Sequence, residues 1–87
     1  MLYSVILLPD AEKSYRKLSF ADHPHFLRVA QALESLKQDP FRGKPLKHKL
    51  KGQLSLRVGV YRIIYTVERQ KITVYILDIG HQREIYR

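Results

Sequence analysis

The sequence has 87 residues, no cysteine and a formal net charge of +8. This length fits one domain, and a content of 45% apolar residues is enough to form a core. The lack of cysteine excludes disulfides, thiolate metal ligands and a cysteine nucleophile, which fits a reducing cytosol. We therefore expect a single cytoplasmic domain that spans residues 1–87.

The positive charge is concentrated in the second half of the chain. Residues 1–41 carry five Lys or Arg and five Asp or Glu, whereas residues 42–87 carry eleven basic and three acidic residues. The stretch 42–51 alone holds five Lys or Arg, one His and no acid. A solvated basic surface is the simplest explanation of such a run. Because the excess is confined to one half, we favour a partner that is a polyanion or an acidic protein.

The first expected elements are a strand and two helices. The apolar run 2–8 is too short for a membrane span and lacks the features of a signal peptide, so we expect no membrane contact. Since it is apolar on both faces, it predicts a strand in the centre of a sheet. Asp10 is expected to cap a first helix that ends near Leu18. Asp22 opens a second amphipathic helix, which ends at Asp39 because the next residue is proline.

Three more strands are expected after a basic loop at 42–51. Residues 53–58 alternate polar and apolar side chains, and residues 60–67 and 72–79 are rich in β-branched and aromatic types. No crossover helix separates these strands, which predicts antiparallel hairpins. The order β-α-α-β-β-β therefore indicates an α+β fold, with two helices packed on one face of a four-stranded, mostly antiparallel sheet.

The first hairpin predicts its own register. If Gly59 and Val60 form a two-residue turn, Arg57 lies directly opposite Arg62. The face toward the helices then holds Leu54, Leu56, Val58, Tyr61, Ile63 and Tyr65. The other face holds Gln53, Ser55, Arg57, Arg62, Ile64 and Thr66.

Two arginines that face each other across a sheet repel, so their charge needs compensation. One explanation is a nearby acid, Asp78 on the last strand or Glu84 in the tail. The other is an anion, most simply a phosphate, bound between the two guanidinium groups. We favour the anion because the loop before the hairpin is also basic.

Two segments, GVYRIIY at 59–65 and IGHQREIY at 79–86, resemble hallmarks of the RelE/ParE toxin superfamily. The first strand, the paired helices and LKG at 50–52 match as well, so the resemblance covers nearly the whole chain. It implies the RelE-like microbial RNase fold and a metal-independent endoribonuclease that cleaves mRNA in the ribosomal A site and inhibits translation. It also implies a cognate acidic antitoxin, and contact with operator DNA only through the toxin–antitoxin complex.

The same resemblance assigns roles to two residues. Arg62 matches the arginine that stabilises the scissile phosphate, and Tyr86 matches the C-terminal tyrosine that orients or activates the 2′-hydroxyl. The chain departs from the RelE pattern at Gln53 and Ser55, where that branch tends to have lysines. It also has Gln82 where many relatives have arginine.

Chemistry indicates an overlapping set of site residues. Metal-free RNA cleavage needs a base, cations at the phosphorane and an acid, and Arg57 and Arg62 suit the cationic role. For proton transfer we favour His81, because the unperturbed pKa of histidine is about 6.5. His48 is a second candidate, and Tyr86 could instead stack on a base. The candidate RNA-binding residues are Lys44, Lys47, His48, Lys49, Lys51 and Arg83.

No cofactor or metal is expected. The chain has no phosphate-binding glycine loop, nucleophile elbow or HExxH motif. Asp22, His23 and His25 lack an identifiable further ligand.

Three functions remain open on this reasoning: a ribosome-dependent mRNA endonuclease, a ParE-like inhibitor of DNA gyrase, and a toxin-fold binding module whose activity has decayed. The pair of His81 and Tyr86 in the tail favours the endonuclease.

Overall fold

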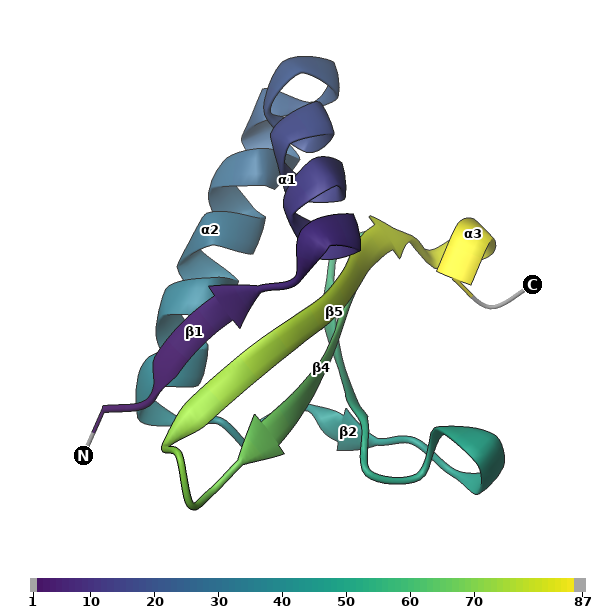
Figure 1. Cartoon of the computed structure of the whole chain (residues 1–87). Coiled ribbons are helices and arrows are strands. Elements are labelled where there is room, and N and C mark those ends of the chain that lie inside the picture. Colours follow the sequence, from purple (N-terminus) through teal and green to yellow (C-terminus); the bar gives the residue numbers. More distant parts are fainter. Residues whose placement is uncertain (1, 86–87) are drawn as a thin grey trace.

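The computed structural model of the protein describes residues 2–85, and two long helices cover one face of a five-stranded sheet (Figure 1). The elements are β1 (Ser4–Leu7), α1 (Pro9–Ala21), α2 (His23–Gln38), β2 (Lys44–Pro45), η1 (His48–Leu50), β3 (Leu54–Val58), β4 (Tyr61–Glu68), β5 (Thr73–His81) and α3 (Gln82–Ile85). The predicted α+β class and the position of the helices are confirmed. The short elements β2, η1 and α3 add to the expected order.

The strand order in the sheet is β1-β5-β4-β3-β2, with β1 parallel to β5 and every other pair antiparallel. The prediction that the first strand is central is therefore wrong, because β1 lies at an edge. Val5 and Leu7 pack against the core, whereas Ser4 and Ile6 are exposed, and Ile6 keeps 45% of its surface accessible. An apolar run on both faces does not by itself fix the position of a strand within a sheet.

The two helices begin at different kinds of residue. Pro9 is the first residue of α1, and Leu8 precedes it as the cap, so Asp10 is not the N-cap that the sequence suggested. Its carboxylate lies in the first turn, where the negative charge interacts favourably with the positive end of the helix dipole. Asp22 opens α2 as predicted, and it caps this helix by accepting the backbone N–H of His25 at 3.3 Å. Within residues 2–85, no helix is long and apolar enough to cross a membrane.

The core lies between the helices and the covered face of the sheet. It consists of Ala11, Leu18, Val29, Leu33, Leu36, Leu54, Val58, Ile63, Tyr65, Val74, Ile76 and Ile79. Tyr65 is fully buried, and its hydroxyl accepts the backbone N–H of Gly43 at 2.9 Å. Burial raises the pKa of Tyr65. This hydrogen bond joins the core to the start of the basic segment 42–51.

Candidate functional site

The two arginines of the first hairpin lie opposite each other, as the sequence predicted. Arg57 of β3 pairs with Arg62 of β4, and the neighbouring pair is Leu56 with Ile63. Gly59 adopts a φ of 62°, the left-handed conformation that the turn requires. Because Ile63 is buried in the core, alternation along the strand places Arg57 and Arg62 on the face away from the helices.

The side chains of the two arginines bind different neutral acceptors. The Nε of Arg57 donates to the carbonyl oxygen of Gly59 at 3.2 Å. The Nη1 of Arg62 donates to the Oγ of Ser55 at 3.4 Å, and the Nε of Arg62 is buried. The guanidinium groups therefore form hydrogen bonds in different directions, which lessens the repulsion expected between directly opposed charges.

Asp78 is one of the two acids predicted to compensate the positive charge of Arg57 and Arg62. Asp78 pairs with Ile64, so it lies on the same face as Arg62. One of its carboxylate oxygens accepts the backbone N–H of Ile79 at 2.9 Å. The second acid considered, Glu84, has its side chain outside what the structure describes.

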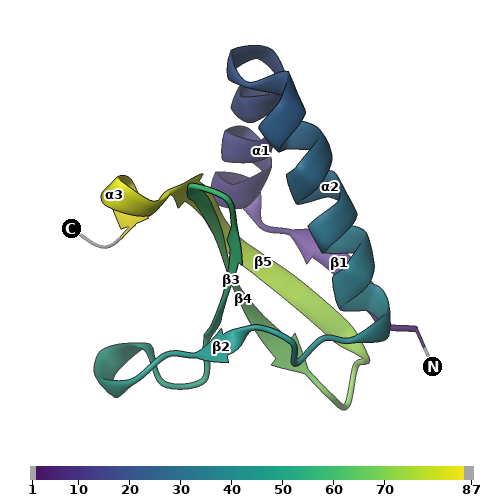
Figure 2. The same ribbon diagram turned by 180° about the vertical axis from the view of Figure 1, so that it is seen from behind.

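The basic segment 42–51 lies beside this face of the sheet. Its candidate side chains are all exposed: Lys44, Lys47, His48, Lys49 and Lys51. The turn between η1 and β3 is joined to the sheet, because the hydroxyl of Thr66 donates to the carbonyl oxygen of Gly52 at 3.1 Å. Both views show η1 and α3 projecting from the side of the sheet that the long helices leave uncovered (Figures 1 and 2). The backbone segments that carry these cations therefore both lie on the uncovered side of the sheet.

The tail begins with α3, which carries the exposed Arg83. The backbone N–H of Gln82 donates to the carbonyl oxygen of Val60 at 2.8 Å, which fixes the start of α3 to the β3–β4 turn. The backbone N–H of Arg83 lies 3.2 Å from Nδ1 of His81. In this contact Nδ1 accepts a hydrogen bond, so a neutral ring carries its proton on Nε2.

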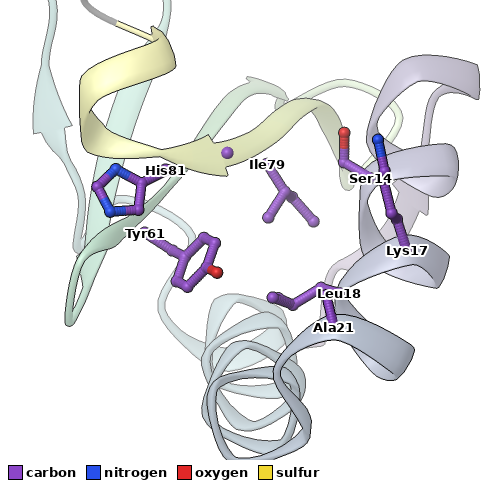
Figure 3. A pocket seen from close by; sticks show the side chains of 8 residues that line it. Ser14, Lys17, Leu18, Ala21, Tyr61, Ile79 and His81 are labelled. Atoms are coloured by element: carbon purple, nitrogen blue, oxygen red, sulfur yellow. The ribbon is translucent and has the colours of Figure 1, made fainter.

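His81 lies on the helix side of the sheet, not on the face of Arg57 and Arg62. It pairs with Tyr61, and the two rings meet edge to face with centroids 5.7 Å apart. Figure 3 shows His81 and Tyr61 beside a cavity of about 350 Å³ whose far wall is α1. The cavity is lined by Ser14, Lys17, Leu18, Ala21, Tyr61, Ile79, Gly80 and His81.

The structure thus brings together only part of the predicted catalytic set. Arg57 and Arg62 share one face, whereas His81 borders a cavity on the other, and Tyr86 lies outside the described residues. The sequence reasoning did not single out Lys17 and Tyr61, which line the cavity with His81. The sequence did contain a signal for Tyr61, because the predicted register places it on the helix side of the sheet. Any residue that pairs with Tyr61 across β4 and β5 lies on that same side.

The histidines at the start of α2 have structural contacts. Nδ1 of His25 lies 2.7 Å from a carboxylate oxygen of Asp22, and the His25 ring packs against Tyr61 at 5.2 Å. His23 stacks on Phe26 with centroids 5.8 Å apart. Within residues 2–85, no three His, Cys, Asp or Glu side chains are grouped so that they could hold a metal ion.

Comparison with known proteins gives matches over nearly the whole chain. Residues 5–86 match the family described as the ParE toxin of the type II toxin–antitoxin system parDE. The toxin RelG of Mycobacterium tuberculosis is 37% identical, and the match covers 100% of this chain and 99% of RelG. The putative toxin RelE4 of Methanocaldococcus jannaschii is 25% identical over 99% of this chain and 93% of its own length.

A similar fold occurs in the crystal structure of the M. tuberculosis toxin–antitoxin complex RelBE2. The matched chain is 31% identical, with a TM-score of 0.83 over 93% of this chain and 92% of that chain.

Proposed function

The chain belongs to the ParE toxin family of type II toxin–antitoxin systems, and from this premise we propose that it is a ribosome-dependent mRNA endoribonuclease. The observation that carries the proposal is the cationic surface around Arg57 and Arg62, on the face that the long helices leave uncovered. A phosphate group that gains negative charge during cleavage is best stabilised by fixed guanidinium groups.

Arg62 is the proposed stabiliser of the scissile phosphate. Its Nε is buried and its Nη1 is directed toward Ser55, so the side chain is held within the sheet surface. Arg57 is more exposed and supplies a second positive charge at the edge of the hairpin. The proposed RNA-binding residues are Arg83 on α3 and five residues of the basic segment, namely Lys44, Lys47, His48, Lys49 and Lys51.

His81 is the proposed proton-transfer residue, with Tyr86 as the residue that orients the 2′-hydroxyl or stacks on a base. The backbone of His81 directly follows Gly80, which pairs with Arg62 across β4 and β5. The ring itself lies on the helix side, and side-chain rotation alone does not bring it to the other face. Reaching a phosphate at Arg62 therefore requires the backbone to move where β5 passes into α3. Its hydrogen bond from Arg83 involves the first turn of α3, and a shift of that turn on RNA binding would release Nδ1.

Exogenous imidazole tests this role of His81. We expect His81→Ala to lower the cleavage rate at least about tenfold, because a proton-transfer group typically contributes a factor of about 10² to 10⁴. Millimolar imidazole should restore part of the rate, because a free imidazole can supply the proton-transfer group that the variant lacks. Arg62→Ala serves as the control, since imidazole cannot replace a guanidinium fork. If His81→Ala cleaves as fast as the parent without imidazole, the assignment is wrong.

A cognate acidic antitoxin is the proposed protein partner, and operator DNA would be bound only through that complex. The support is the net charge of +8 and the structure of a toxin–antitoxin complex for a relative that is 31% identical. Co-purification with the product of a neighbouring short gene for an acidic protein tests this pairing.

Inhibition of DNA gyrase is the second candidate function, because the matching family model is that of the ParE toxin. Pulse labelling after brief induction separates the two. An RNase that removes messages should reduce methionine incorporation before thymidine incorporation. Earlier loss of thymidine incorporation would favour gyrase as the target.

A further inference from the structure

Three arginines from separate parts of the chain line one groove beside the end of β3 that β2 does not pair with. They are Arg28 of α2, Arg42 from the segment after α2, and Arg57 of β3. The groove has a volume of about 280 Å³ and is completed by Gln31, Ala32, Leu56, Val58 and Gly59. Arg28 and Arg42 are not among the residues to which a role has been assigned above.

Neighbouring polar atoms hold two of these three side chains in place. Nη1 of Arg42 donates to the hydroxyl of Ser35 at 2.7 Å, and Nε of Arg57 donates to the carbonyl oxygen of Gly59 at 3.2 Å. Nη1 of Arg28 lies 3.1 Å from the position that a Cβ atom on Gly59 would occupy. The guanidinium groups of Arg28 and Arg57 therefore both approach the β3–β4 turn.

The charge of the groove is positive and is not balanced by its own lining. None of its eight lining residues is acidic. Glu34 and Asp39 line an adjacent hollow that also includes Arg42, but Glu34 is paired with Lys37 at 3.1 Å. Guanidinium groups bind phosphate through forked, charge-assisted hydrogen bonds, so an anion in the groove would lower the repulsion among the three arginines.

The lining favours a nucleic acid over a protein segment. Protein interfaces take much of their affinity from large apolar or aromatic anchors. Among the described residues, the large exposed apolar side chains are Leu2, Ile6, Phe20, Leu27, Phe41, Leu50 and Val60. None of them lines this groove, where Val58 is buried and Leu56 is partly buried.

We propose that the groove of Arg28, Arg42 and Arg57 binds a backbone phosphate of single-stranded RNA adjacent to the segment held at Arg62. This inference rests on the proposed function, and it extends the RNA contact around the edge of β3 onto α2. Arg57 belongs to both regions, because it pairs with Arg62 and also lines the groove. A continuous strand could therefore pass from the sheet face to the helix.

Salt dependence of RNA binding tests the proposal. The probe is a fluorescein-labelled, 2′-O-methyl single-stranded RNA, which lacks the hydroxyl needed for cleavage, and the readout is fluorescence anisotropy over a series of salt concentrations. Each lost phosphate contact reduces the slope of log K against log salt by about 0.7 for a single strand. We expect this reduction in both Arg28→Gln and Arg42→Gln. Lys71→Gln, at an exposed position before β5, removes the same charge and should retain the parental slope.

The outcomes distinguish the groove from the function. If the parent binds and both arginine variants keep its slope, the groove inference fails while the proposed function stands. If the variants lose affinity only for a purified acidic antitoxin, the groove serves a protein and the inference is likewise overturned. If the parent itself does not bind this free RNA, the groove inference fails, whereas the proposed function is decided separately by cleavage on ribosomes. Should Arg42→Gln lower the melting temperature through its bond to Ser35, Arg28→Gln alone decides the result.

Discussion

Replacing Arg62 with alanine is expected to lower the rate of mRNA cleavage about a hundredfold while the protein remains folded. Loss of one preorganised donor to a developing oxyanion typically costs a factor of about 10² to 10³, or roughly 2.7–4 kcal/mol of transition-state stabilisation. The fold should tolerate the change, because Arg62→Ala removes a charge that lies opposite Arg57. Single-turnover cleavage and a thermal melt of the same preparation measure the two effects.

Two further variants make this result specific. Arg62→Lys retains the charge but not the planar fork, so it should recover only part of the lost rate. Lys71→Ala removes an exposed cation on the turn before β5 and should cleave at the parental rate. A variant at Arg62 that unfolds, yet cleaves normally for each folded molecule, would show that this arginine is structural.

Replacing Tyr65 with alanine should destabilise the protein by about 3–5 kcal/mol, since it empties the place of a large aromatic side chain in the core. Tyr65 is fully buried, and its hydroxyl holds the backbone of Gly43 at the start of the basic segment. Tyr65→Phe should cost less, about 1–3 kcal/mol, by leaving the N–H of Gly43 without its acceptor. Urea unfolding of the three proteins measures these losses.

The loss of stability at alkaline pH provides an independent check that Tyr65 is buried. Burial raises the pKa of Tyr65 above the ordinary value of 10.0, so the folded protein keeps a proton that the unfolded chain loses. This contribution to stability is present below pH of about 10 and is lost as pH rises toward the folded-state pKa. Tyr65→Phe should therefore lose less stability than the parent above pH 10. Tyr75→Phe, on the other face of the sheet, is the matched control, and equal alkaline losses in all three proteins would contradict the assignment.

The fold was largely predictable where local chemistry determines it. Gly59 favours the turn conformation that sets the register, so the pairing of Arg57 with Arg62 followed from the sequence. The start of α2 was also predictable from local chemistry, because Asp22 directly precedes a first turn that contains proline. The edge position of β1 was not, since its partner β5 lies almost seventy residues further along the chain.

The arrangement of the candidate site was predictable only in part. Alternation along β3 and β4 gave the face of the two arginines. The face of His81 depends on the β4–β5 register, which shifts between Ile64 and Tyr65. Such an irregularity changes the face of later residues and leaves no clear mark in the sequence. Arg28 is in the half of the chain with no net charge, so only the packing of α2 beside β3 reveals it next to Arg57.

The central claim, that this toxin cleaves mRNA on the ribosome, is tested most directly by mapping cuts with purified components. Messenger RNA is incubated with the toxin in the presence and in the absence of ribosomes stalled at a defined codon, and the 5′ ends are read by primer extension. We predict cuts at the codon in the A site, only when ribosomes are present, and their loss with Arg62→Ala. An intact message on stalled ribosomes, together with inhibition of gyrase supercoiling by the same preparation, would contradict the account.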